Sequence, residues 1–154
     1  MRVGNLMNRN VYACSRLDTL QRAAKLMWEN DCGFLPVVEG RRVVGTVTDR
    51  DALMGAYTRN APLGTILVSN VMSDDLVVCS VDDDVRSAES LMQRRRVRRL
   101  PVLDARGDLV GVITLGDLAR HAQSTAFRRA RESLTVAKTL AAVCEPRSTS
   151  HAAE

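Results

Sequence analysis

Residues 44–51 read Val-Gly-Thr-Val-Thr-Asp-Arg-Asp, and residues 110–117 read Val-Gly-Val-Ile-Thr-Leu-Gly-Asp. Each stretch is a short run rich in β-branched residues that ends in a threonine, with an aspartate three residues later. The run is typical of a strand, and a threonine followed by an acid at this spacing favours the start of a helix. The chain therefore contains the same strand-to-helix junction twice.

The duplication extends beyond this motif. An offset of 65 residues places Leu35-Pro36-Val37 on Leu100-Pro101-Val102, and an offset of 66 places Asp51 on Asp117. The added residue falls at 104–108, a stretch with turn composition, where insertions are tolerated. Self-similarity of this kind indicates a repeated structural unit.

Each copy is predicted to form a βαββα unit. A short extended segment leads to Asp18 or Asp83, which is expected to cap a helix. Apolar residues at i, i+3, i+4 and i+7 mark that helix, and two apolar runs joined by a tight turn predict a hairpin after it. Thr48 or Thr114 opens the last helix. One such unit buries little apolar area, so we expect an α/β (α+β) fold in which two units pack face to face with pseudo-twofold symmetry.

The predicted boundaries follow the repeat. Residues 1–60 form repeat 1, 61–70 a linker, 71–121 repeat 2, 122–144 a C-terminal helix and 145–154 a disordered tail. The composition of residues 57–64 favours the linker. The C-terminal helix carries an apolar stripe at alternating three- and four-residue spacing, widened by neighbouring apolar residues. The stripe consists of Phe127, Ala130, Leu134, Ala137, Ala141 and Cys144, with Val136, Leu140 and Val143 beside it. This helix either folds back on its own module or stabilises a dimer.

The composition excludes several classes of protein. The 154 residues are 45% hydrophobic and 26% charged, as in an ordinary globular domain. The net charge is +4, but aromatic residues make up only 3%, which argues against a stacking platform for nucleic acid. The N-terminus lacks the apolar region of a secretory signal, and no apolar stretch approaches the roughly 20 residues that span a bilayer. We therefore expect a cytoplasmic protein without membrane contact.

No catalytic constellation and no metal-ligand spacing are evident, so we expect neither an enzyme nor a metal site. Cys14 and Cys79 occupy equivalent positions and are expected to be buried strand residues, in preference to a redox-linked pair. The arginine-rich run at 94–99 is expected to end a helix, where cations oppose the helix dipole.

The twice-repeated pattern of Leu-Pro-Val, a turn, and Val-Gly-h-h-Thr-x-x-Asp resembles the CBS (cystathionine-β-synthase) domain pair, or Bateman module, over about residues 3–121. The resemblance implies binding of an adenosyl ligand (AMP, ADP, ATP, NAD or S-adenosylmethionine) in clefts between the repeats, and frequent pairing into a disc-shaped homodimer. It also implies that Asp51 and Asp117 hold ribose, and that Thr48 and Thr114 contact ribose or phosphate.

The two copies differ at positions that matter for a ligand. Three residues before its proline the second copy has Arg98, where the family often carries a basic residue that reaches phosphate, whereas the first copy has a glycine. We therefore expect Thr114, Asp117 and Arg98 to form the better site. Ala13 and Val78 stand where the family often has a threonine that frames the base, which leaves apolar and backbone contacts for adenine.

Two interpretations of the Thr-x-x-Asp motif remain open and compatible, a capping box and a ligand site at a helix start. The function predicted first is an adenine-nucleotide sensor whose change in packing is read by another, unknown protein. The alternative is a structural dimerisation scaffold with empty clefts. A weaker third possibility is a nucleic-acid-binding stress protein that uses the arginine run.

Overall fold

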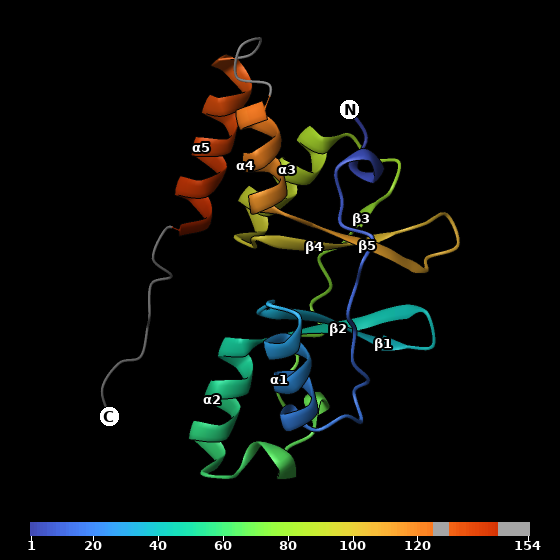
Figure 1. Cartoon of the computed structure of the whole chain (residues 1–154), viewed down its shortest axis with the longest axis vertical. Coiled ribbons are helices and arrows are strands. Elements are labelled where there is room, and N and C mark those ends of the chain that lie inside the picture. The colour runs from blue at the N-terminus through green and yellow to red at the C-terminus, as the bar shows by residue number, and fades with distance from the viewer. Residues whose placement is uncertain (125–129, 145–154) are drawn as a thin grey trace.

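The computed structural model describes residues 1–124 and 130–144, and it gives two similar halves stacked along the long axis (Figure 1). The first half contains α1 (Leu20–Glu29), β1 (Phe34–Glu39), β2 (Arg42–Thr48) and α2 (Asp49–Arg59). The second contains β3 (Cys79–Ser80), α3 (Val85–Arg95), β4 (Arg99–Leu103), β5 (Leu109–Thr114) and α4 (Leu115–Ser124), followed by α5 (Ala130–Cys144). Short 3-10 turns lie at Val3–Asn5, Leu63–Thr65 and Val68–Asn70. The predicted mixed α/β architecture of tandem units is confirmed.

The hairpins of the two halves have the same register. Phe34 pairs with Thr48 in the first half, and Arg99 pairs with Thr114 in the second. Each hairpin has one register shift at the equivalent place, and each turn contains a glycine at positive φ, Gly40 at 62° and Gly107 at 82°. Glycine adopts this conformation without steric cost. The local signals of both copies therefore produce the same hairpin.

The caps of α1 and α3 lie one residue later than predicted. The Thr19 hydroxyl accepts from the N–H of residue 22 at 3.3 Å, and the Asp84 carboxylate accepts from the N–H of residue 86 at 2.9 Å. Asp18 and Asp83 instead accept the N–H groups of residues 15 and 80, each at 2.8 Å. These carboxylates fix the turn before each helix, so the prediction that Asp18 and Asp83 are the caps was wrong.

The expected linker is largely structured. The stretch 57–59 belongs to α2, which ends at Arg59 and is followed by the C-cap Asn60 in the left-handed conformation (φ 47°). Ile66 and Val68 within residues 61–70 are buried in the core of the first half. Backbone bonds hold this stretch to the start of α1, including one of 2.8 Å from Leu20 N–H to the Ile66 carbonyl. Residues 61–70 therefore complete the first half as well as lead out of it.

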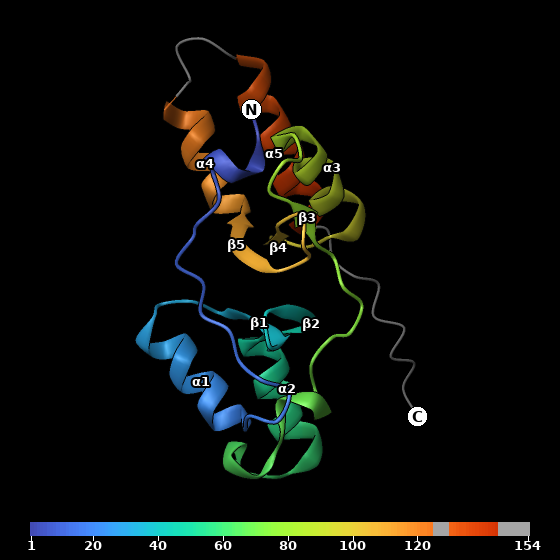
Figure 2. The same ribbon diagram turned by 90° about the vertical axis from the view of Figure 1, so that its right-hand side faces the viewer.

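The first residues of each repeat pack on the other half of the molecule. Val3 and Met7 are buried in the core of the second half, and Asn8 exchanges backbone hydrogen bonds of 2.9 Å with Val112 of β5. In the same way Ser73, at the start of the second repeat, exchanges bonds of 2.9 Å with Thr46 of β2. Figure 2 shows the N-terminal segment (residues 1–8) beside the upper half before the chain descends to α1. The halves are thus interlocked.

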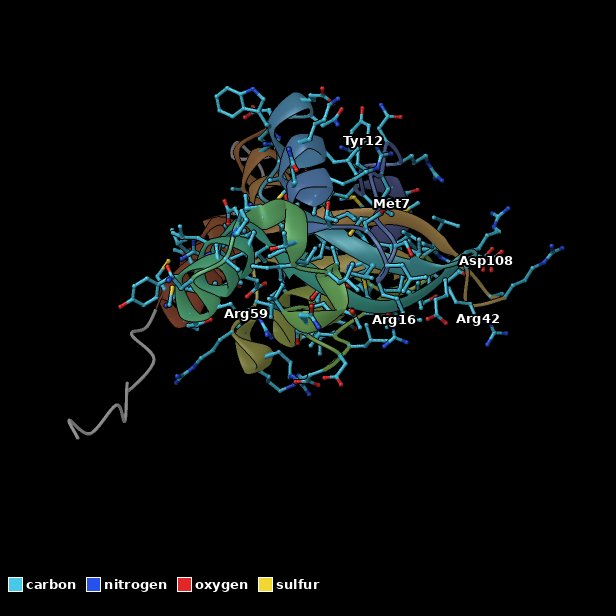
Figure 3. The ribbon with its side chains drawn as sticks, turned by 90° about the horizontal axis from the view of Figure 1, so that it is seen from below. Met7, Tyr12, Arg16, Arg42, Arg59 and Asp108 are labelled. Carbon is cyan, nitrogen blue, oxygen red and sulfur yellow. The ribbon has the colours of Figure 1, made fainter. Side chains whose placement is uncertain are left out.

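The halves also meet at the turns of the hairpins. The Arg41 guanidinium lies 2.9 Å from the Asp108 carboxylate, and Leu109 N–H donates to the Arg41 carbonyl at 3.0 Å. Figure 3 shows Arg42 and Asp108 together at this edge, away from Met7 and Tyr12.

The C-terminal helix folds back on its own module, against α3 and α4 (Figure 1). α4, which ends at Ser124, and α5, which begins at Ala130, pack against each other as two helices. Phe127 and the expected tail lie outside the described residues. The predicted stripe is confirmed only in part: Ala137, Ala141 and Cys144 are exposed, whereas Val143 beside them is buried together with Thr139, which is not part of the stripe. A bond of 2.7 Å from the side chain of Gln93 in α3 to the Thr139 hydroxyl explains the inward polar residue. Within residues 1–124 and 130–144, no helix has both the length and the apolar character needed to cross a membrane.

Candidate functional site

The Thr-x-x-Asp motifs form the same reciprocal geometry at the starts of α2 and α4. The Asp51 carboxylate accepts from the Thr48 N–H at 2.8 Å and from its hydroxyl at 2.7 Å, and the Asp51 N–H donates back to that hydroxyl at 3.2 Å. Asp117 and Thr114 repeat this pattern with distances of 2.8, 2.7 and 3.1 Å. The capping interpretation is confirmed. In both motifs the two bonds that the carboxylate accepts use the same oxygen, Oδ2, and the third bond has the threonine hydroxyl as its acceptor.

The second carboxylate oxygen distinguishes the two motifs. In Asp117 it accepts from the guanidinium of Arg120, one turn later on α4. The Arg120 side chain is 73% exposed and that of Asp117 only 13%. The arginine therefore covers the carboxylate from the solvent side, and it can leave without unpacking the core.

A cavity of about 180 Å³ lies beside Thr114 and Asp117, between the halves. Its walls come from the stretch after the N-terminal segment, from β1 and the residues before it, from β4 and β5, and from the start of α4. The lining residues are Asn8, Asn10, Val11, Tyr12, Cys32, Phe34, Pro36, Arg99, Val112, Thr114, Asp117 and Arg120. Typical small-molecule pockets have roughly 300–1,000 Å³, so a ligand of nucleotide size would extend beyond these walls or widen them.

The lining combines apolar surface with a few polar groups, as ligand sites do. Tyr12 is 45% exposed and offers an aromatic ring. The Arg99 guanidinium lies 6.0 Å from the centre of the Phe34 ring, within the range of a cation–π contact. The cavity therefore supplies flat apolar surface for a ring, a carboxylate for hydroxyl groups and two guanidinium groups for an anion.

The structure brings Thr114 and Asp117 into this cavity and separates them from other predicted residues. Thr48 and Asp51 lie at the equivalent helix start of the other half, outside the lining. Ala13 follows the lining residue Tyr12 without being part of the lining itself, and Val78 does not contribute to it either. The roles of these residues toward a ligand stay predictions.

Arg98 is not part of the lining either. Its carbonyl accepts from Leu115 N–H at 2.8 Å, and its guanidinium lies 3.6 Å from the Cys144 sulfur of α5. The role of Arg98 toward a ligand stays a prediction. Arg99 lines the cavity instead, because it pairs with Thr114 across the hairpin, and directly opposite residues share a face of a sheet. That register could have identified Arg99 from the sequence, and the three-residue spacing after Asp117 could have identified Arg120.

The remaining arginines of the run lie at a helix end, as predicted. Arg94 and Arg95 occupy the last turn of α3, and Arg95 is paired with Asp75. Cation pairing and the helix terminus account for their position, and the arrangement adds nothing in favour of a nucleic-acid surface.

The cysteines are all free, and their environments differ. Burial raises the pKa of the Cys14 and Cys79 thiols to about 12, and the nearby Asp18 and Asp83 add to the effect. Both side chains are buried at equivalent positions, as predicted. In the described part of the chain, His, Cys, Asp and Glu side chains form no cluster suited to a metal ion.

Comparison with known proteins places these features in context. The model of the CBS domain matches residues 3–56 and 68–124. The CBS domain-containing protein YhcV of Bacillus subtilis is 38% identical over 122 residues, which is 79% of this chain and 86% of that protein. A conserved CBS domain protein of unknown function from Thermoplasma acidophilum superimposes with a TM-score of 0.76 at 26% identity, over 92% of this chain and 75% of that one. The structure of CBSX2 in complex with AMP has a TM-score of 0.69 at 26% identity, over 81% of this chain and 98% of that one.

Proposed function

Because the chain belongs to the CBS domain family, we propose that it is a non-catalytic regulatory module that binds an adenine nucleotide in the cavity between its repeats. The observation that carries the proposal is the convergence of Asp117, Tyr12 and Phe34 on one cavity, although they come from different halves. The Asp117 carboxylate would accept from ribose hydroxyls, and the aromatic and apolar walls would hold the adenine. The AMP complex of CBSX2 supports this ligand class.

The position of the cavity supports a regulatory role. Its walls come from both halves and include Asn8, whose backbone is bonded to Val112. A ligand bound there would contact residues of both halves and would favour one packing of the halves over another. A ligand shifts such an equilibrium only by its difference in affinity for the two states. The output is the change in packing, which we propose is read by a separate protein in the cytoplasm.

Thermal unfolding with AMP, ADP, ATP, NAD and S-adenosylmethionine tests the proposal. A ligand at 100 times its Kd stabilises a protein by about 2.7 kcal/mol, which for a chain of this size raises the Tm by about 5–10 °C. We expect Asp117→Ala to abolish this shift. Asp51→Ala is the matched control, because it removes the same capping bonds outside the cavity. No shift with any of the five compounds, or an unchanged shift for Asp117→Ala, contradicts the proposal.

We also propose that the protein forms a homodimer through the first repeat. Helices α1 and α2 pack together and present large apolar side chains to solvent: Trp28 is 88% exposed, Leu53 68% and Tyr57 77%. In the second repeat α5 covers the equivalent helices α3 and α4. Exposed apolar side chains gathered on neighbouring helices are typical of an interaction surface.

A second copy of this chain is the partner that fits the face. Lys25 and Glu29 flank Trp28 on the exposed side of α1. A twofold axis that sets two α1 helices antiparallel places the lysine of one copy opposite the glutamate of the other, which makes the face complementary to itself. Because α5 occupies the other face, this dimer is joined through one repeat and is not the closed disc expected from the resemblance.

Sedimentation equilibrium tests the dimer. Leu53→Arg is expected to give a monomer, whereas Leu17→Arg, at a position that is 73% exposed outside α1 and α2, is expected to leave the dimer intact. A wild-type chain that stays monomeric at every concentration contradicts the dimer. A dimer in which none of the five compounds shifts the Tm favours the structural scaffold instead. Salt-sensitive binding of DNA or RNA would favour the third function.

A further inference from the structure

We propose that the cavity selects adenosyl ligands that carry phosphate, and that Arg120 makes the selection by changing its partner from Asp117 to the phosphate. This inference rests on the proposed function and names the ligand class of the same site. It also predicts that the ligand binds at only one of the two Thr-x-x-Asp motifs, the one formed by Thr114 and Asp117.

The two oxygens of the Asp117 carboxylate have different partners. One of its oxygens is engaged by the Thr114 N–H and hydroxyl, and the other accepts from Arg120. A ribose hydroxyl that donates to the second oxygen therefore competes with Arg120 for it. Displacement costs little of the fold, since the arginine side chain is 73% exposed and bound to the residue three positions before it on the same helix.

A displaced Arg120 remains at the edge of the cavity, where its guanidinium has lost its pairing with Asp117 and can bind another anion. Guanidinium groups bind phosphate well because their N–H groups match its oxygens. The phosphate of the ligand can thus replace the Asp117 carboxylate as the partner of Arg120. Adenosine offers no anionic group, and S-adenosylmethionine carries a sulfonium and an ammonium against a single carboxylate, so its net charge is positive.

The charge of the lining favours the same class. Arg99 and Arg120 give two positive charges against one negative charge from Asp117. Arg99 is also held in place, because its guanidinium lies over the Phe34 ring at 6.0 Å. The cavity with its carboxylate engaged by ribose therefore keeps two unpaired guanidinium groups, which repel a cation and attract a phosphate.

The equivalent positions beside Thr48 and Asp51 in the other half do not carry the positive charges of the cavity. The repeat offsets of 66 and 65 residues place Met54 where the cavity has Arg120, and Phe34 where it has Arg99. The counterpart of Asn10 is Asp75, whose carboxylate is paired with Arg95. The site beside Thr48 and Asp51 thus lacks both arginines and gains an acid, so a phosphate has no cationic partner at those positions.

Isothermal titration calorimetry with AMP, adenosine and S-adenosylmethionine tests the inference. We expect one AMP per chain, with an affinity about tenfold or more above that of the other two compounds, as charge-assisted bonds provide. Arg120→Met, which copies the residue of the other half, is expected to lower AMP affinity about tenfold and to leave adenosine affinity within about threefold, because only AMP gains from the freed arginine. Arg22→Met is the matched control, since Arg22 lies near Asp18 on the surface, outside the cavity.

The outcomes separate this inference from the proposed function. Equal affinity for AMP and adenosine, or equal losses for both in Arg120→Met, overturns the role of Arg120 while nucleotide binding stands. Binding of S-adenosylmethionine as tight as AMP overturns the charge selection, and two AMP molecules per chain overturn the single site. Failure of all three compounds to bind overturns the proposed function itself.

Discussion

Replacing Gly45 by alanine should destabilise the protein at the junction of the interlocked halves, because the glycine lies where the start of the second repeat crosses β2. A Cβ at this position would lie 2.8 Å from the Ser73 carbonyl oxygen and 3.1 Å from the Met72 sulfur. The Ser73 carbonyl accepts from Thr46 N–H at 2.9 Å, so it cannot move away without breaking that bond. Overpacking of this kind costs about 1–3 kcal/mol.

For a chain of this length such a loss lowers the Tm by about 2–4 °C per kcal/mol. The related change Gly111→Ala brings a Cβ against the Met7 sulfur and, at 3.1 Å, the Asn8 carbonyl oxygen, and it should act in the same direction. Gly116→Ala is the control, because its nearest neighbours are 3.5 Å away and it lies in the first turn of α4. There alanine should stabilise by up to about 1 kcal/mol.

Urea unfolding followed by far-ultraviolet circular dichroism measures these changes. Fluorescence is a poor probe here, because the single tryptophan, Trp28, is 88% exposed. A midpoint for Gly45→Ala equal to that of the wild type would refute the interlock as a rigid crossing. A midpoint for Gly116→Ala that falls as far as that of Gly45→Ala would show that the loss reflects glycine replacement in general.

Three further predictions concern buried groups. The thiols of Cys14 and Cys79, with their pKa raised to about 12, should react with a disulfide reagent at pH 8 only after unfolding, whereas the exposed Cys144 reacts in the native protein. Because these thiols ionise near pH 9 when unfolded, the unfolded chain loses protons first, so the free energy of unfolding should fall as the pH rises from about 9 toward 12. Cys14→Ala should make this fall shallower in pH-dependent urea titrations, and an unchanged slope would contradict the assignment. Thr139→Val should destabilise by about 1–3 kcal/mol, since the Gln93 amide loses its acceptor; a midpoint equal to the wild type would show that this bond contributes nothing.

The parts of the fold that local signals specify could be predicted from the sequence. The capping pairs at Thr48 and Thr114 and the turns at Gly40 and Gly107 each depend on a few adjacent residues, and each occurs twice. Two copies that agree in register make a chance pattern improbable. The hairpins and the helix starts after them therefore agree with expectation.

The misplaced features depend on competition or on distant contacts. Asp18 and Thr19 are both able to cap α1, and the turn at Ser15 takes the aspartate, which leaves the threonine to the helix. Arg98 and Arg99 are adjacent arginines, and only the pairing of Arg99 with Thr114 decides which one lines the cavity. Periodicity alone predicts neither choice.

The orientation of α5 and the exchange of segments also come from tertiary packing. The apolar pattern of the sequence does not predict that Thr139 faces the core. The Gln93 side chain of α3 bonds to its hydroxyl, and this contact with a distant residue explains why a polar side chain is buried there. In the N-terminal segment, Val3 and Met7 look like any short apolar sequence, and nothing nearby in the chain indicates that they belong to the core of the second half.

The interlock has a consequence for how the protein comes to exist. Val3 and Met7 are synthesised before the first repeat is complete, yet the elements of the second half that receive them, β5 among them, are synthesised only after the first repeat. During synthesis of the first repeat, the side chains of Val3 and Met7 therefore have no core to pack into. The core of the first half is also incomplete until Ile66 and Val68 have been synthesised. Completion of either half should thus be a late event in biogenesis, and a messenger truncated between the repeats should yield a product that quality-control proteases remove.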